Sequence, residues 1–489
     1  MKKYILIILC CLTSFPLWSY NENMIVEHYS VDQGLPNNTV NCTLKDRDGF
    51  IWFGTWYGLC CFDGVKFKTF NKQEHDSDVP PRKIQRIVED KNGYIWVKTI
   101  DRKLYVFNKV TECFHAVYDD MKNYSENIQV IKLQNTAEGD VLLLTKDKNL
   151  LLAGVDEKGQ VTIKILFDSR DEINKHDYTL KHHVLCETEE YISWIGTDYK
   201  VSAVHKGAEL ASRPADFITS KINSGDKDSF TSFFEDGRKV WVGDRAGIFY
   251  SIDVRTGLVN RYVLSEIKGA ISNLLVTPAG YVYLSVAGQG TYEYDLAERR
   301  LQKINTEMND AMVTHAFIDQ YDKIWFHENE KALIYYDPLN HTAKRFPFTM
   351  FGKITTLYSV DAGERGLFFL APAGEAWLFD REHAEMVYIN KLKQLSNDRA
   401  NQQFYHLMLD NDGVLWLSSA DEGVYCMNFP KKQFNLLSLS PQSAGQENYT
   451  IGVRALFQSK SGDIWVGTRW LSVYLMDRKV VTKQVFSTV

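Results

Sequence analysis

The sequence lacks the features that mark several large classes of protein. Its 489 residues include 11 prolines and 30 glycines, dispersed along the chain, which excludes a low-complexity linker or a fibrous repeat. Lys and Arg (56) do not outnumber Asp and Glu (62), and a net charge of −6 gives no support for nucleic-acid binding, which needs concentrated positive charge. A hydrophobic content of 45% and an aromatic content of 13% nevertheless predict an ordered globular chain.

Long hydrophobic runs are also missing. After the N-terminus no stretch reaches the roughly 20 apolar residues that cross a bilayer, so we expect no membrane span in this chain. The N-terminus itself has Lys2 and Lys3, an apolar run at residues 4–12 and then polar residues, which is typical of a secretory signal peptide. We therefore expect a cleaved signal peptide at residues 1–20 and a periplasmic mature chain. An uncleaved anchor, or a lipid on Cys10 or Cys11, is the alternative.

Metal-binding and catalytic motifs are equally scarce. The cysteines that would remain after cleavage are widely spaced without a paired CxxC pattern, which favours buried free thiols over a zinc site or a disulfide scaffold; they are Cys42, Cys60, Cys61, Cys113, Cys186 and Cys426. HExxH, GxSxG and phosphate-binding glycine loops are absent. Adjacent strand residues face opposite sides, so His182 and His183 are poor partners for one metal ion. We predict no catalytic residue, no metal and no cofactor.

What the sequence does contain is one phrase repeated about ten times. Clear copies, of the form Asp-x-x-Gly-x-apolar-Trp, occupy residues 46–55, 90–99 and 410–419, and residues 460–468 carry a related copy. The anchors from Trp52 to Trp465 recur about every 46 residues, which is the period of a four-stranded propeller blade.

Each repeat can be read as four strands. In the first, residues 40–44 alternate apolar and polar, Asp46 to Gly49 suit a tight turn, and residues 50–54 form a continuous apolar run. Residues 59–62 and 65–70 follow as two more strands. The recurrent tryptophan should pack between blades, because each blade needs a neighbour on both faces. This prediction covers Trp52, Trp96, Trp194, Trp241, Trp325, Trp416 and Trp465.

The fold class predicted is therefore an all-β propeller of four-stranded blades. Ten units exceed the typical four to eight of one ring. We expect about seven blades in residues 21–349 and about three blades of an incomplete second ring in residues 350–489, so that the chain would be a fragment or the product of a truncated gene. A single irregular ring is the alternative.

The opening phrase at residues 29–40, followed by residues 46–55 and by Phe62-Asp63-Gly64, resembles the start of the two-component regulator propeller family. The resemblance implies an exported sensor region of a hybrid two-component system, in which propellers bind an oligosaccharide and control a kinase through the geometry of a homodimer. It also implies that this chain is not an enzyme, because the family's kinase portion is absent from it.

Ligand-binding residues are expected in the loops that follow each Gly-Thr phrase, because these loops share one face of a propeller. Aromatic rings stack on sugars and arginine binds carboxylate or sulfate groups. The residues favoured are Trp56, Arg102, Tyr199 and Arg245; further candidates are Tyr57, Asp101, Asp198, Asp244, His327, Glu328, Arg469 and Trp470. A propeller enzyme, either a polysaccharide lyase or a glycoside hydrolase, and a protein-binding scaffold are the alternative functions.

Overall fold

The computed structural model describes only part of the chain. The described residues are 25–70, 80–121, 129–146, 149–167, 185–187, 190–195, 201–205, 215–216, 230–304, 313–328, 331–348, 357–361, 363, 366–371, 375–381, 383–389, 404–428, 452–461, 463–469, 472–476 and 482–487. Tyr199 and Trp470 lie outside them, as does Asp198, and so does the expected signal peptide. Trp194 lies on a described strand, but its side chain does not belong to the described part.

Strands dominate the described residues, which form ten antiparallel four-stranded sheets. Blade 1 consists of β2 (Val40–Lys45), β3 (Ile51–Thr55), β4 (Gly58–Phe62) and β5 (Phe67–Phe70). Blade 2 has β6 (Ile84–Glu89), β7 (Ile95–Thr99), β8 (Leu104–Asn108) and β9 (Cys113–Ala116), and blade 3 has β10 (Val130–Asn135), β11 (Val141–Thr145), β12 (Leu150–Val155) and β13 (Val161–Phe167). Blade 4 has β14 (Leu185–Glu187), β15 (Tyr191–Ile195), β16 (Val201–His205) and β17 (Ala215–Asp216).

The next four sheets repeat this order. Blade 5 has β18 (Phe230–Glu235), β19 (Lys239–Asp244), β20 (Ile248–Asp253) and β21 (Val259–Val263); blade 6 has β22 (Ile271–Val276), β23 (Tyr281–Val286), β24 (Gly290–Asp295) and β25 (Arg300–Lys303). Blade 7 has β26 (Val313–Ile318), β27 (Ile324–Glu328), β28 (Ala332–Asp337) and β29 (Thr342–Pro347), and blade 8 has β30 (Tyr358–Asp361), β31 (Leu367–Leu370), β32 (Ala376–Asp380) and β33 (Glu385–Ile389). One 3-10 turn (Val31–Gln33) and one short helix, α1 (Tyr118–Met121), accompany these strands. The predicted all-β fold class of four-stranded blades is confirmed.

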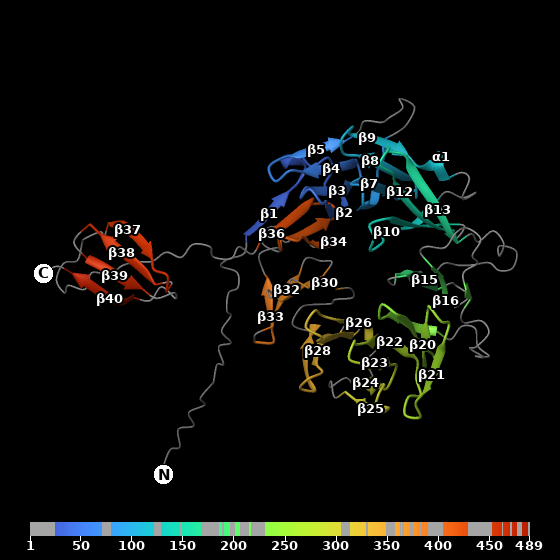
Figure 1. The fold of residues 1–489 in the computed structure, drawn as a ribbon. Helices are drawn as coiled ribbons and strands as arrows, with labels where there is room; N and C mark the ends of the chain where they lie inside the picture. The colour runs from blue at the N-terminus through green and yellow to red at the C-terminus, as the bar shows by residue number, and fades with distance from the viewer. Residues whose placement is uncertain are drawn as a thin grey trace, which may run out of the picture. The chain divides into compact units, whose positions relative to one another are not determined.

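Blade 9 joins the two ends of the ring. It contains β34 (Phe404–Leu409), β35 (Leu415–Ser419) and β36 (Val424–Asn428), and its fourth strand is β1 (Ile25–Tyr29) from the N-terminus. Glu27 lies opposite Cys426 in the antiparallel β1–β36 ladder. Figure 1 shows the nine sheets following one another in a ring from β2 through β20 and β28 back to β36.

Apolar contacts run all the way around this ring. Nine clusters of buried side chains each join one blade to the next, including the pair formed by blade 9 and blade 1. The first compact unit accordingly extends to Phe429, not to residue 349. The structure therefore corrects the expected division into seven and three blades: the described residues give nine blades and one. The typical ring size misled the sequence estimate, because the pairing of β1 with a strand almost 400 residues away has no local signal.

The tenth sheet belongs to a second unit, residues 430–489, and is described by itself. It contains β37 (Val453–Gln458), β38 (Ile464–Thr468), β39 (Ser472–Met476) and β40 (Thr482–Ser487). All six residues of β37 are exposed, whereas the equivalent strand β2 of the ring is largely buried. Trp465 is half-buried and stacks on Phe486, with ring centroids 5.8 Å apart.

The repeat tryptophans of the ring whose side chains are described are buried between blades: Trp52, Trp96, Trp241, Trp325 and Trp416 are each at most 5% exposed. Their indole N–H groups also donate to an aspartate in the preceding turn. The bonds are Trp52 to Asp46 (2.7 Å), Trp96 to Asp90 (2.9 Å), Trp241 to Asp236 (2.7 Å), Trp325 to Asp319 (3.2 Å) and Trp416 to Asp410 (3.2 Å).

One carboxylate thus performs two tasks in each of these blades. The Oδ1 atom of Asp46 accepts bonds from the backbone N–H groups of Asp48 and Phe50, which fixes the turn, while its Oδ2 accepts the indole bond. Blades 3 and 6 lack the tryptophan and have Thr136 or Thr277 in place of the aspartate. These threonines close the turn through one hydroxyl, because no indole needs a second acceptor. Leu142 stands six residues after Thr136, at the place that Trp52 occupies after Asp46.

The first strand of a blade lies closest to the axis of the ring, since β34, β2, β6 and β10 contact one another in succession. Most first strands carry a β-bulge after their first residue, as between Val40 and Cys42 in β2 and between Ile84 and Arg86 in β6. A bulge leaves backbone groups outside the ladder. Side chains of neighbouring blades bind some of them: Asn41 donates to the carbonyl of Ile84 at 2.7 Å, and Asn273 to that of Val313 at 2.9 Å.

The cysteines with described side chains are free thiols, and the side chain of Cys186 lies outside the described part. Cys42, Cys60, Cys113 and Cys426 are buried and Cys61 is half-buried, which agrees with the prediction of buried thiols without disulfides. Within the part of the chain that the structure describes, no helix has the length and apolar character needed to cross a membrane.

Candidate functional site

The ring has two faces, and each face carries a different set of turns and connections between strands. The turns between the first and second strands, such as Asp46 to Gly49, lie on one face together with the turns between the third and fourth strands; we call it the Asp-turn face. The connections between the second and third strands, such as Trp56 and Tyr57, lie on the opposite face with the connections between blades; we call it the loop face. This division follows from the up-and-down order of the strands in every blade.

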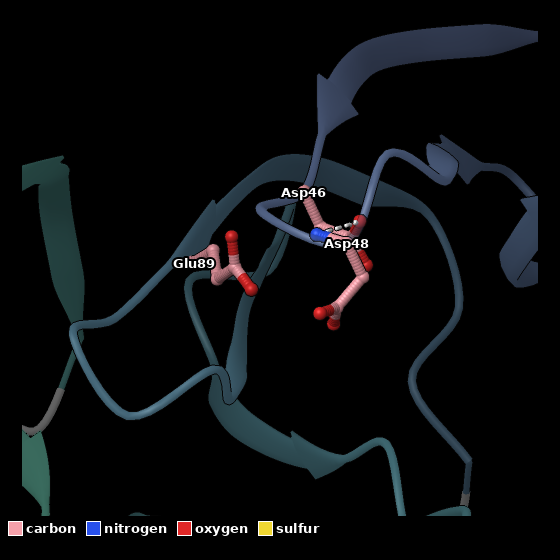
Figure 2. A group of neighbouring side chains, drawn as sticks. All are labelled: Asp46, Asp48 and Glu89. Atoms are coloured by element: carbon pink, nitrogen blue, oxygen red, sulfur yellow. Dashed lines mark hydrogen bonds between the residues drawn. The ribbon is translucent and has the colours of Figure 1, made fainter.

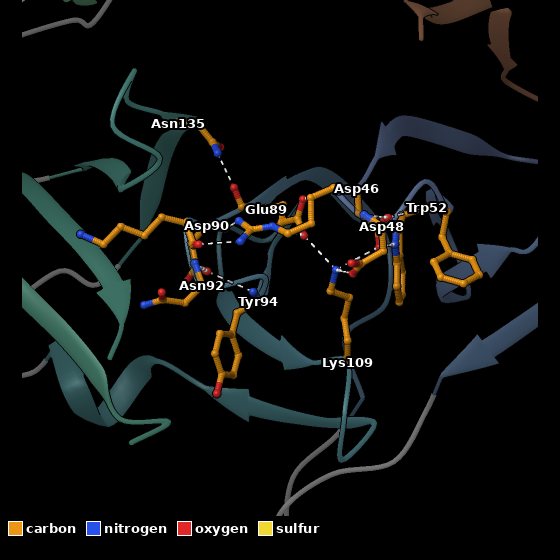
Figure 3. A network of polar contacts seen from close by, with 12 residues as sticks. Asp46, Asp48, Trp52, Glu89, Asp90, Asn92, Tyr94, Lys109 and Asn135 are labelled. Carbon is orange, nitrogen blue, oxygen red and sulfur yellow. Dashed lines mark hydrogen bonds and ion pairs between the residues drawn. The ribbon is translucent and has the colours of Figure 1, made fainter. Parts of the chain in front are cut away.

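The Asp-turn face has a group of three carboxylates at the junction of blades 1 and 2. Figure 2 shows Asp46, Asp48 and Glu89, whose oxygens approach within 4.8 Å of one another. The ammonium group of Lys109 lies among them, at 3.0 Å from Asp46, 2.7 Å from Asp48 and 2.8 Å from Glu89 (Figure 3). Arg47 adds a second ion pair to Glu89 at 3.2 Å. The protein's own cations therefore neutralise most of this group.

Burial lowers the pKa of Lys109, but the hydrogen bonds that its ammonium donates to Asp48, Glu89 and Asp46 outweigh this effect and raise the pKa above its usual value. Lys109 therefore stays charged and joins the two blades. Arg381 occupies the same position in blade 8, where it binds Asp319 at 2.6 Å and Asp361 at 2.8 Å. We interpret both groups as structural links between blades.

The loop face carries the predicted ligand residues of blades 1 and 2, and backbone bonds connect their loops. The carbonyl of Trp56 accepts from the backbone N–H of Lys83, whose own carbonyl accepts from Ile100. The carbonyl of Arg102 accepts from Val130 of blade 3. Trp56 is 41% exposed and Tyr57 64%, and the ammonium of Lys83 lies 5.1 Å from the Trp56 ring centroid. The backbone N–H of the exposed Lys146 donates to the carbonyl of Gln129, the residue before Val130. We call the residues Trp56, Tyr57, Lys83, Arg102 and Lys146 the loop-face arc.

Arg102 has an uncommon backbone conformation. Its φ is +68°, a left-handed region that costs a non-glycine residue about 1 kcal/mol. At the equivalent place, three residues after the end of the phrase, blade 1 has Gly58 and blade 5 has Gly247, both with positive φ. Arginine therefore replaces glycine here at an energetic cost, and its exposed side chain donates a hydrogen bond to the side-chain oxygen of Gln129 at 3.4 Å. Such a cost is a reason to look for a function.

The other predicted residues are not brought together with this arc. Arg245 is exposed on the loop face but belongs to blade 5. Asp244 is buried and fixes its own turn by accepting from Ala246 and Ile248. Further candidates belong to strand β27 itself: Glu328 is 3% exposed and paired with Arg345 at 3.0 Å, and His327 bonds to Thr314. Arg469 lies in the second unit.

A cavity of about 470 Å³ lies where sequence reasoning nominated nothing, along the first strands of blades 9, 1, 2 and 3. Its lining includes Cys42, Arg86 and His406, which follow the bulges of three neighbouring first strands. Alignment of the repeats could have found them, because a charged or imidazole side chain recurs at this place in Arg86, Lys132, His315 and His406.

Blades of this kind define a β-propeller. Residues 34–57 match the family model described as "Two component regulator propeller", which confirms the resemblance seen in the sequence. A search of curated proteins finds no match.

Several solved structures are similar to the chain. The extracellular domain of the hybrid two component system BT3049 from B. thetaiotaomicron has 15% identity and a TM-score of 0.33, and the match covers 95% of this chain and 66% of that one. The extracellular domain of the one component system BT4673 from B. thetaiotaomicron has 18% identity and a TM-score of 0.32, covering 94% and 61%. BamB from Moraxella catarrhalis has 12% identity and a TM-score of 0.40, covering 84% and 100%. The chain thus spans less than two thirds of the length of the first two.

Proposed function

We propose that this chain is the sensor propeller of a two-component regulatory system, exported to the periplasm, and that it binds a saccharide on the loop face without chemistry. The observation that carries the proposal is the loop-face arc, in which exposed aromatic rings and cations from three consecutive blades lie on connected loops. Aromatic rings can cover the apolar face of a sugar, and arginine can bind its hydroxyl or acidic groups. The match to the regulator propeller family supports the sensor role.

The acidic groups favour a binding protein over an enzyme, because these carboxylates already have partners within the protein. A glycosidase needs two carboxyl groups that face the same glycosidic bond. On the loop face, Asp101 accepts from the Thr99 hydroxyl and pairs with Lys103 at 3.4 Å, and Asp244 is committed to its turn. The grouped carboxylates near Lys109 lie on the opposite face and hold the blades together.

The test is calorimetry with a panel of oligosaccharides, combined with an assay for new reducing ends or unsaturated products. We expect binding without turnover. Trp56→Ala and Arg102→Ala should each weaken binding about tenfold, since each removes about 1–2 kcal/mol of contact. Arg245→Ala is the matched control, because it removes an exposed arginine from the same face of a distant blade.

The outcomes separate the candidate functions. Turnover would replace the sensor by an enzyme, and binding of proteins but of no oligosaccharide would replace it by a scaffold. Equal losses in Arg102→Ala and Arg245→Ala would move the site away from the loop-face arc and return Arg245, with Tyr199, to the binding set. Light scattering with and without ligand tests the homodimer that the family resemblance implies.

A further inference from the structure

The cavity along the first strands has a composition that suits a ligand. Its volume of about 470 Å³ lies within the range of small-molecule sites. Four strands from four consecutive blades form its walls, so the loop-face arc contributes nothing to it.

Most polar groups of the lining already have partners within the protein. Lys45 pairs with Asp410 at 3.4 Å and with Asp412. Glu89 pairs with Lys109 and Arg47, and the Thr43 hydroxyl bonds to Ser418 at 2.6 Å. Burial raises the pKa of Cys42 to about 12, so its thiol is neutral.

Two groups of the lining are left over. The side chain of Arg86 is exposed, and no carboxylate of the described residues pairs with its guanidinium, so its positive charge is available to a ligand in the cavity. The Nδ1 atom of His406 is shielded from solvent and has no hydrogen-bond partner within the described chain. A buried polar atom left in this state costs about 1–3 kcal/mol, so a bound group that satisfies it gains that much.

Arg86 and His406 stand close enough to influence each other. Burial, and then the positive charge of Arg86, lower the pKa of His406 to about 4, so the imidazole is neutral at pH 7. A neutral imidazole can hold its proton on Nδ1 and donate it. An acceptor with a negative charge placed between the two would receive bonds from both.

We propose that this cavity binds the carboxylate of a small organic anion, with Arg86 and the Nδ1–H of His406 as the donors. A carboxylate carries one negative charge, which balances the charge of Arg86, and it offers one oxygen to Arg86 and one to His406. The anion is either a free organic acid or the acidic unit of a saccharide. The inference goes beyond the proposed saccharide site, because it concerns other residues and another part of the ring.

The test is calorimetry on the full chain with three probes. Glucuronate carries a carboxylate on a sugar ring, lactate carries one without a sugar, and glucose is the neutral match. We expect binding of glucuronate, lactate or both, and none of glucose. Binding of both identifies a free organic acid as sufficient, and binding of glucuronate alone identifies an acidic sugar. Failure of both acids to bind, or equal binding of glucose, overturns the proposal.

Two variants locate the site. Arg86→Gln, at an exposed side chain, should weaken the binding of the acid at least about tenfold, because it removes a charge-assisted bond. Arg245→Gln is the matched control, because Arg245 is an exposed arginine of the loop face outside both the cavity and the loop-face arc, and this variant should bind the acid as the wild type does. The reverse pattern would assign the acid to the loop face and overturn the cavity site. As an independent readout, saturating acid should raise the pKa of His406 in NMR titrations from about 4, and an unchanged His406 would contradict the proposal.

Discussion

Replacing Asp90 with alanine tests whether the repeated aspartate holds both its turn and its tryptophan. Asp90 is 1% exposed and accepts four hydrogen bonds: from the backbone N–H groups of Asn92 (2.9 Å), Tyr94 (3.0 Å) and Val155 (3.3 Å), and from the indole of Trp96 (2.9 Å). The substitution leaves all four donors without this acceptor.

The expected loss follows from which donors water can reach. Trp96 is fully buried and Val155 is 3% exposed, so neither donor can turn to solvent. At about 1–3 kcal/mol for each buried unsatisfied donor, Asp90→Ala should lower the free energy of unfolding by about 2–6 kcal/mol.

Asp156→Ala is the matched control. Asp156 also closes a tight turn, by accepting from the backbone N–H groups of Lys158 and Gln160, but both donors are exposed and no indole is involved. Its loss should stay below about 1 kcal/mol. Urea unfolding followed by far-UV circular dichroism measures both variants. Equal losses would refute the reasoning, because the turn alone would then account for the effect.

Three further predictions concern charges and thiols. Arg381→Met leaves Asp319 and Asp361 without their cation between blades 7 and 8 and should lower the free energy of unfolding, measured in urea, by about 3 kcal/mol. Lys68→Met breaks an exposed pair with Glu112 and should lower it by less than about 1 kcal/mol. Similar losses in the two variants would contradict the role of Arg381 as a link between blades. Burial lowers the pKa of Lys98 from 10.5 to about 8, so the folded chain loses this proton at a lower pH than the unfolded chain does. The free energy of unfolding of the wild type, compared with that of Lys98→Met, should therefore rise as the pH increases from about 8 to 10.5. A decrease over this pH range would contradict the assignment. Burial raises the pKa values of Cys42 and Cys426 to about 12, so a thiol reagent at pH 8 should label them, by mass spectrometry, only after unfolding; rapid labelling of the folded chain would show that they are accessible.

The sequence predicted those parts of the fold that depend on local pattern. Strands such as β3 and β7 are continuous apolar runs after an Asp-x-x-Gly turn, and the position of Trp52 or Trp96 in such a run implies burial between blades. The bond from indole to aspartate was not predicted, because it depends on how the turn orients Oδ2. Ring closure was not predicted either, since β1 and β36 are far apart in the chain.

The candidate site was predictable only in part. The position after the Gly-Thr phrase places Trp56 and Arg102 on exposed loops, but the same rule also selected Glu328, which lies within β27 and pairs with Arg345. Arg86 and His406 gave no signal in their own segments. They become neighbours only because the ring brings β34, β2 and β6 together.

The most direct test of the nine-bladed ring is a cross-link between its first and last strands. Glu27 lies opposite Cys426, and cross-strand neighbours have Cβ atoms about 5 Å apart. Glu27→Cys, refolded in an oxidising buffer so that both thiols can react before Cys426 is buried, should therefore form a disulfide with Cys426, detected as a linked peptide by mass spectrometry. His28→Cys is the control, because its side chain lies on the other face of β1. A linked peptide in Glu27→Cys alone is the result that a ring closed by β1 and β36 predicts, and its absence would contradict that closure.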